Sequence, residues 1–247
     1  MILAPIKSPA RQLAAVGLIA LLFTGCVAVP TVTPTPSPSP LPTVPPTTPP
    51  YSLAPSPNGC PTSAPAPLTG TSTVTVTTNF GDIVIKVDGS LGSNAAGAFV
   101  AMASCGYYNN VMFHRVVPGF IIQGGDGQYA RLPNIQFSLM GQGGPGWTVK
   151  DDKVTTTYKR GTVAMARTGS ADSGSTQFFI VLDDSAQTTL GASTANNYAI
   201  FGNVTAGMAV VDRIAAVPLG GEPDVGVGGP SMPLQPVVIT STLVATP

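Results

Sequence analysis

The chain has 247 residues, of which only 9% are charged, and its eleven basic residues balance its eleven acidic ones. A formal net charge of zero provides no basic surface, so we expect no nucleic-acid partner. One histidine and three cysteines are too few for most metal sites and hydrolytic triads, so we expect no metal and no other cofactor.

The first 26 residues have the pattern of an export signal. Lys7 and Arg11 precede an apolar run, Leu13–Phe23. This run is too short to span a membrane as a helix, for which about 20 residues are needed. The following Thr24-Gly25-Cys26 resembles the end of the bacterial lipobox, in which the cysteine is acylated. We therefore expect Cys26 to anchor the chain to the cell membrane, outside the cytoplasm. Because Phe23 replaces the usual Leu or Val, ordinary cleavage and secretion remain the alternative.

Residues 27–67 contain 15 of the 26 prolines and no charged residue. Proline fixes φ and lacks an amide donor, so this tract is expected to be a disordered, extended tether. A ligand for proline-reading domains or a glycosylated stalk are the alternatives. Cys60 lies in the tract and Cys105 in the single domain expected over 68–247. Outside the cytoplasm such a pair is expected to be oxidised, and a free, buried Cys105 is the alternative.

Short alternating segments separated by glycine-rich turns predict β-strands from Thr71 onward. A helix is expected from Ser93 or Asn94, either of which could cap it, to about Cys105. A second helix, capped by Thr205, is expected over about Ala206–Ala216. Strands are expected around Val74–Val76 and Asp82–Val87 and near Val111–Phe113, Phe120–Gln123, Trp147–Val149, Thr162–Ala166, Phe178–Val181, Ile200–Val204 and Val237–Val244. Many short strands with only two helices favour a mainly β barrel or sandwich.

Two segments place a few polar side chains among apolar ones, as small-ligand sites do. The first is Phe113-His114-Arg115-Val116-Val117-Pro118-Gly119-Phe120-Ile121-Ile122-Gln123-Gly124-Gly125-Asp126, and the second extends from Gly161, through Met165-Ala166-Arg167, to Gln177-Phe178-Phe179-Ile180. Together they resemble the two signature segments of cyclophilin-type peptidyl-prolyl cis-trans isomerases, and the first matches at every fixed position. The resemblance implies a closed eight-stranded antiparallel β-barrel capped by two α-helices. We expect the protein to be a monomer and to need no cofactor.

The resemblance also implies the roles of individual residues. Arg115 would be the catalytic group, donating to the imide nitrogen of a half-rotated X–Pro bond. The substrate would be proline-containing peptides and unfolded exported proteins. Residues expected to bind the substrate are Phe120, Ile121, Gln123, Ala166, Arg167, Gln177, Phe179, Leu190 and Tyr198. Tyr198 stands where eukaryotic members have a histidine, and Leu190 lies in a segment that is difficult to align.

Other interpretations of these residues are weaker. His114 is expected to pack behind the site and not to react, because no Ser-centred turn of a hydrolase accompanies it. The pattern G-x-G-x-x-G occurs at residues 141–146, but it contains Pro145 and is followed by Trp147. No helix is expected there whose N-terminus could bind a pyrophosphate. A peptide-binding holdase without turnover, or a β-rich adhesin on a proline stalk, are the competing functions.

Overall fold

The structure is a computed structural model that describes residues 59–192, 197–223 and 229–245. The predicted export signal, the lipidation site at Cys26 and the tether up to residue 58 lie outside the described residues. Within the described ranges, every helix is too short or too polar to cross a membrane.

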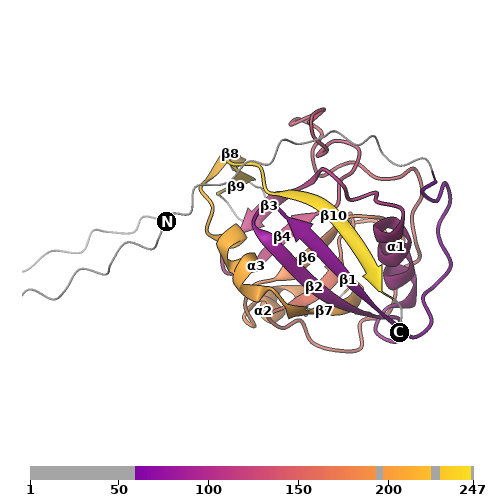
Figure 1. The fold of residues 1–247 in the computed structure, drawn as a ribbon. Coiled ribbons are helices and arrows are strands. Elements are labelled where there is room, and N and C mark those ends of the chain that lie inside the picture. Colours follow the sequence, from indigo (N-terminus) through magenta and orange to yellow (C-terminus); the bar gives the residue numbers. More distant parts are fainter. Residues whose placement is uncertain (1–58, 193–196, 224–228, 246–247) are drawn as a thin grey trace, which may run out of the picture. The chain divides into compact units, whose positions relative to one another are not determined.

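Eight antiparallel strands close into a barrel in the spatial order β1-β10-β3-β4-β6-β5-β7-β2 (Figure 1). Their bounds are β1 Thr71–Thr78, β2 Gly81–Asp88, β3 Val111–Val117, β4 Ile121–Gly124, β5 Thr162–Met165, β6 Phe178–Val181, β7 Ile200–Ala206 and β10 Val238–Ala245. The predicted closed barrel is therefore confirmed. A separate two-stranded sheet, β8 (Leu219–Pro223) with β9 (Pro230–Pro233), was not predicted from the sequence.

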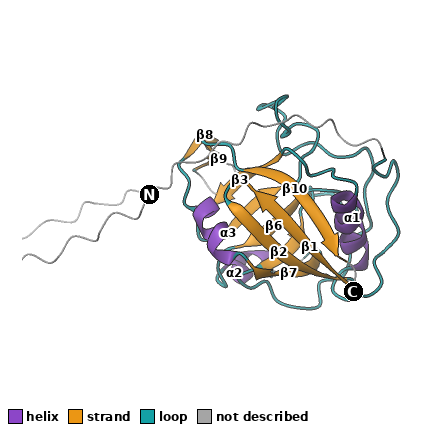
Figure 2. Cartoon of the chain, viewed as in Figure 1, coloured by secondary structure: helices purple, strands orange, loops and turns teal. Residues whose placement is uncertain are grey.

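Two helices cover opposite ends of the barrel, as Figure 2 shows. Helix α1 (Ser93–Ser104) buries Phe99 in the barrel core, and α3 (Met208–Ala215) buries Ile214 there. A third, short helix, α2 (Ala186–Leu190), buries Ala186 and Leu190. The sequence predicted the two end helices but not α2.

Alternation along the central strands gives the barrel wall two apolar faces. Ile122 of β4 and Ile180 of β6 point into the main core, which is also filled by Phe113 of β3. Their neighbours Ile121 and Phe179 belong to a second cluster on the outer face. Successive side chains of a strand point to opposite sides, so a strand can be apolar on both only where something covers each side. This outer cluster is where the candidate site lies.

Both helix starts differ from the expected caps. Helix α1 follows Gly92, and its amides at Asn94 and Ala95 donate to the Asp152 carboxylate at 3.2 and 2.9 Å. The cap therefore comes from a residue 58 positions away, where a sequence-local rule does not look. Helix α3 follows Gly207, whose φ of 90° is in the left-handed region, so Thr205 does not cap it.

One predicted strand is absent as such. Around Trp147–Val149 the structure has only an isolated bridge between Val149 and Gly174. The indole of Trp147 instead donates a hydrogen bond to the Pro61 carbonyl at 2.9 Å between Nε1 and O. Residues 59–68 form a strap that is attached to the domain by the disulfide between Cys60 and Cys105. The Cα atoms of the two cysteines are 5.2 Å apart. The packed domain thus extends N-terminally beyond the boundary expected at residue 68.

Candidate active site

Three of the expected site residues lie in one row across neighbouring strands. Arg115 of β3 is paired in register with Gln123 of β4, and Gln123 with Phe179 of β6. A register shift between Phe113 and Arg115 interrupts the β3–β4 ladder directly before this row. A bulge of this kind changes the direction of the following side chain, here toward the outer cluster. The strand pairing therefore brings a guanidinium, an amide and an aromatic ring together.

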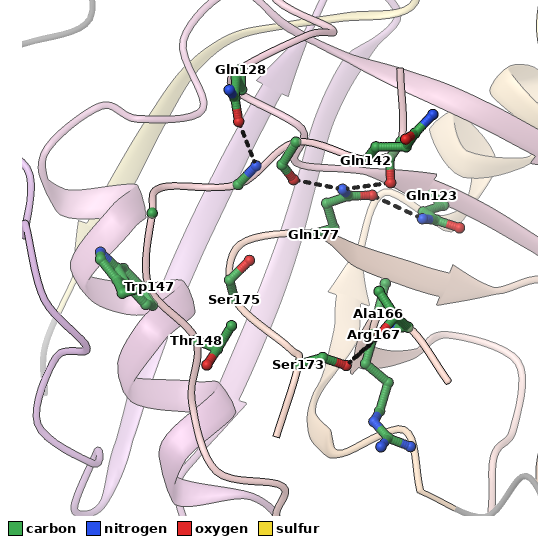
Figure 3. A pocket seen from close by; sticks show the side chains of 15 residues that line it. Gln123, Gln128, Gln142, Trp147, Thr148, Ala166, Arg167, Ser173, Ser175 and Gln177 are labelled. Atoms are coloured by element: carbon green, nitrogen blue, oxygen red, sulfur yellow. Dashed lines mark hydrogen bonds between the residues drawn. The ribbon is translucent and has the colours of Figure 1, made fainter. Parts of the chain in front are cut away.

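A chain of amide hydrogen bonds fixes the polar side of this row. Arg115 Nη1 donates to Gln123 Oε1 at 3.4 Å, and Gln123 Nε2 donates to Gln177 Oε1 at 3.0 Å. The Gln177 Nε2 group then donates to the carbonyls of Gly141 and Gly143 at 2.9 and 2.8 Å. Figure 3 shows this succession from Gln123 through Gln177 to the loop that carries Gln142. Each side-chain amide is thus held in one orientation.

The loop that receives Gln177 is held by Asp126, a residue to which the sequence assigned no role. Its side chain is fully buried, and its Oδ2 accepts the amides of Gly141 and Gly143 at 2.7 and 3.1 Å. Its Oδ1 accepts the amides of Gln128 and Tyr129 at 3.1 and 2.8 Å. A buried carboxylate with four donors is well compensated for its loss of water. Its place directly after Gln123-Gly124-Gly125, the last position of the first motif, was the available signal.

The apolar side of the site gathers six expected residues in one cluster. They share a place on the outer face of the barrel: Phe120, Ile121, Ala166, Phe179, Leu190 and Tyr198. The rings of Phe179 and Tyr198 meet edge to face with centroids 5.6 Å apart. Leu190, the assignment that alignment left least secure, reaches the cluster through helix α2. A proline ring would find a preformed apolar surface here, bordered by Arg115 and Gln123.

Tyr158 belongs to the same cluster and was missed by the sequence analysis. Its hydroxyl donates to the Tyr198 carbonyl at 2.9 Å. Burial raises the pKa of Tyr158 to about 12, so the phenol keeps the proton that it donates. The contact fixes the backbone at Tyr198, which lies two residues before β7 begins at Ile200. No motif surrounds Tyr158, and only the folded chain brings it to this place.

Next to this row is a cavity of about 490 Å³. Its walls are mainly glycines, amides and hydroxyls: Gln123, Gln128, residues 141–144, Gly146, Trp147, Thr148, Ala166, Arg167, Thr168, Ser173, Ser175 and Gln177. Figure 3 shows the Arg167 guanidinium turned away from Gln177. It pairs with the Asp151 carboxylate at 3.1 Å and is only 5% exposed. The contact with substrate that is expected of Arg167 would therefore come from its backbone and not from this guanidinium. The 141–146 stretch forms a wall of the cavity and begins no helix.

His114, which precedes Arg115 on β3, is a packed residue. It is 5% exposed. Burial lowers the pKa of His114 to about 4, the Asp126 carboxylate opposing that shift and the Arg115 guanidinium adding to it. The imidazole is therefore neutral near pH 7. Within the described residues there is no group of three or more His, Cys, Asp or Glu side chains that could bind a metal ion.

Comparison with known proteins agrees with this geometry. The family model described as cyclophilin type peptidyl-prolyl cis-trans isomerase/CLD matches residues 73–244. This chain belongs to the cyclophilin family. The predicted membership of that family and the enzyme class, a peptidyl-prolyl cis-trans isomerase, are thereby confirmed.

Among curated relatives, peptidyl-prolyl cis-trans isomerase A of Dickeya dadantii is 36% identical over 182 residues, covering 72% of this chain and 87% of the relative. Isomerase B of Escherichia coli is 38% identical over 149 residues, covering 60% and 86%. The crystal structure of a Cryptosporidium parvum cyclophilin is similar with a TM-score of 0.57 and 26% identity, covering 72% of this chain and 99% of that one. The range matched by the family model, residues 73–244, includes nearly all of the barrel and the site residues but not the N-terminal tract.

Proposed function

We propose that this cyclophilin acts on X–Pro bonds of exported polypeptides at the outer side of the cell membrane, with Arg115 as its catalytic group. The observation that carries the proposal is the row Arg115–Gln123–Phe179, in which strand pairing brings a guanidinium next to residues of the outer apolar cluster. Rotation about the imide bond faces a resonance barrier of about 18–20 kcal/mol. Any group that binds the half-rotated bond better than the planar forms lowers that barrier.

The guanidinium fits that role for a physical reason. When the bond rotates, resonance is lost and the imide nitrogen regains a lone pair that can accept a hydrogen bond. A planar isomer offers no such acceptor, so a donor aimed at the nitrogen stabilises the transition state selectively. Arg115 is half-buried, and the Gln123 amide contacts it from the neighbouring strand. Phe120 and Phe179 would hold the proline ring while the preceding residue turns.

The proposed location rests on the N-terminal sequence alone. The charged start, the short apolar run and Cys26 support export and lipidation, and the proline-rich tract supports a spacer between the membrane and the barrel. The proposed client class, unfolded exported proteins, follows from that location. Monomeric action is part of the proposal, because one chain supplies all the residues of the row.

Two measurements test the proposal separately. In the first, the purified chain is assayed for cis-trans isomerisation of an Ala-Pro peptide, with Phe179→Ser as a variant that loses the apolar wall. The proposal expects rapid isomerisation and a kcat/KM at least about 10-fold lower in the variant, since burying an apolar side chain of this size contributes about 1.5–3 kcal/mol and every 1.4 kcal/mol corresponds to a factor of ten. No acceleration by the intact chain would contradict it.

In the second, cells are grown with a labelled fatty acid, and the chain is compared with a Cys26→Ser variant. Label on the first and not on the second supports the anchor. If the intact chain and the variant are both unlabelled and are found in the medium in equal amounts, the secreted alternative is favoured.

A further inference from the structure

The N-terminal tract and the site are connected through a contact that suggests a second use of the groove. We propose that residues 30–57 are an intramolecular ligand and substrate of the groove beside Arg115. The proposal rests on the proposed function, because it assigns a substrate to the same site. It concerns a segment of this chain and not a separate protein.

The first support is the place where the tract meets the domain. Cys60 is joined to Cys105 at the end of α1, with 5.2 Å between the two Cα atoms. One residue later, the Pro61 carbonyl accepts the hydrogen bond of the Trp147 indole at 2.9 Å. Since a covalent bond and a directed hydrogen bond both act on adjacent residues, the chain upstream starts from a fixed point on the domain.

The second support is that this point adjoins the site. Trp147 is part of the wall of the 490 Å³ cavity whose opposite wall includes Gln123, Ala166 and Gln177. In Figure 3 the indole and the two glutamines lie on different sides of the same space. The indole is therefore bonded close to the C-terminal end of the 30–57 segment, while the cavity that it helps to form leads to Gln123 and its partner Arg115.

The third support is the chemistry of the two partners. Residues 30–57 contain twelve prolines, no charged residue and mostly Ser, Thr, Ala and Val between the prolines. Among the residues that form the cavity wall, Arg167 alone is charged, and the Asp151 carboxylate neutralises it at 3.1 Å. An uncharged segment of small residues enters such a cavity without leaving a charge of its own unpaired. Every second or third residue of it presents an X–Pro bond of the type that Arg115 would act on.

The fourth support is reach. Pro50 and Pro42 lie roughly 35 and 60 Å of extended chain upstream of Pro61, at about 3.3 Å per residue. Both lengths exceed the cavity's dimension several-fold, so the chain can enter the groove and return to its attachment. A ligand joined by a linker of this length has an effective concentration of about 1 mM. That is sufficient to compete with weakly bound external peptides.

The deciding experiment measures isomerisation of the tract itself. In the chain from residue 27 to 247, NMR magnetisation exchange follows the cis and trans forms of the X–Pro bonds in residues 30–57. Uncatalysed exchange takes tens to hundreds of seconds, so mixing times of about one second give no exchange peaks. We expect exchange peaks for the intact chain, with a rate that is unchanged on tenfold dilution. The Arg115→Ala variant should lose them.

A second measurement uses turnover of an added Ala-Pro peptide. A variant with serine at all twelve proline positions of residues 30–57 keeps the tract's length and its attachment at Cys60. If the tract competes for the groove, this variant has a lower KM for the added peptide and an unchanged kcat. The Leu243→Ser variant is the matched control, because Leu243 is 70% exposed on β10 and contributes nothing to the cavity wall. It should leave both constants unchanged.

The outcomes separate this proposal from the proposed function. If the added peptide is isomerised while the tract exchanges no faster than a free peptide of the same sequence, the intramolecular proposal is wrong and the proposed function stands. Exchange that slows in proportion to dilution shows action between molecules and also overturns it. If the intact chain isomerises neither the tract nor the added peptide, both proposals fail together.

Discussion

Gln123 accepts a hydrogen bond from Arg115 across two neighbouring strands, with 3.4 Å between Oε1 and Nη1. The same side chain donates to Gln177 at 3.0 Å, so its two ends are both engaged. We expect Gln123→Glu to keep an acceptor for Arg115 but to lose the donor for Gln177. Misplacing a reacting group by about 1 Å can cost 100-fold in rate, so kcat should fall by about 10- to 100-fold.

Steady-state isomerisation of an Ala-Pro peptide measures this effect. Gln123 positions Arg115 and would also border the substrate. Whether the variant changes kcat or KM therefore tells the two roles apart. A variant with a raised KM and an unchanged kcat would mean that Gln123 only binds substrate, and the positioning role would be wrong.

The buried Asp126 should couple stability to activity. Asp126→Asn keeps one acceptor oxygen and replaces the other with an NH2 group, so the side chain can no longer accept both the amides of Gly141 and Gly143 and those of Gln128 and Tyr129. Hydrogen bonds to charged groups contribute about 1.5–3 kcal/mol each, so we expect the free energy of unfolding to fall by at least about 2 kcal/mol. Activity should fall as well, since the carbonyls of the same loop orient Gln177.

Urea unfolding and the isomerase assay, done on the same preparations, measure both effects. Asp82→Asn is the matched control, because the Asp82 side chain is exposed and its change should stay within about 0.5 kcal/mol. Full stability of the Asp126→Asn variant would show that the loop does not depend on this carboxylate.

His114 makes the stability of the domain depend on pH. Its folded-state pKa of about 4 lies below the usual histidine pKa of 6.5, so the unfolded chain binds a proton that the folded chain resists. Stability from this group is therefore fully present above pH 6.5 and is lost as the pH falls toward 4. The loss over that window is about 3 kcal/mol, at about 1.4 kcal/mol per pH unit of pKa difference.

Denaturant unfolding between pH 8 and 4 measures this loss, and His114→Gln provides the reference. Glutamine is polar, of similar size and does not titrate, whereas the carboxylates that also protonate in this window are common to both chains. The free energy of unfolding of the parent chain, minus that of the His114→Gln variant, should therefore fall by about 3 kcal/mol as the pH falls from 8 to 4. A difference that stays constant over this window would show that His114 titrates normally.

The strap at residues 59–68 should contribute to stability through its disulfide. In the double variant Cys60→Ser/Cys105→Ser, a link between residues 45 positions apart is removed. A disulfide of this kind contributes about 2–4 kcal/mol, and the midpoint of urea unfolding should fall accordingly. Trp147, the single tryptophan, is bonded to the strap and should report its release as a change in fluorescence.

A thiol count provides the direct check on the chain from residue 27. The unfolded, oxidised chain should contain no free thiol. Two free thiols would show that Cys60 and Cys105 are not linked, which is the alternative that the sequence left open.

The barrel was predictable from the sequence because its strands are short, alternating and separated by turns, and the two signature segments then fixed the fold class. The elements that were missed or misplaced depend on contacts between distant residues. Asp152 caps α1 from 58 positions away, and the Trp147 indole bonds to Pro61 instead of lying in a strand. A local pattern contains no information about either partner.

The site divides in the same manner. Arg115, Gln123 and Phe179 were identified because the motifs contain them, and strand register places them in one row. Asp126 and Tyr158 act through backbone groups of other segments, which any residue type supplies. Their partners therefore leave no mark in the sequence, although the position of Asp126 at the end of the first motif was a usable signal.

The role of Arg115 is tested most directly by comparing turnover with binding in two variants. Arg115→Ala removes the donor, and Arg115→Lys keeps the charge but loses the planar fork. Removing one donor to a transition state typically costs about 100- to 1000-fold in rate. We predict a loss of that size in kcat/KM for the alanine variant, a partial loss for the lysine variant, and peptide Kd values within about tenfold of the parent. An alanine variant that isomerises peptides at the parent's rate would contradict the account, and the groove would then be a peptide-binding surface whose catalysis does not depend on this guanidinium.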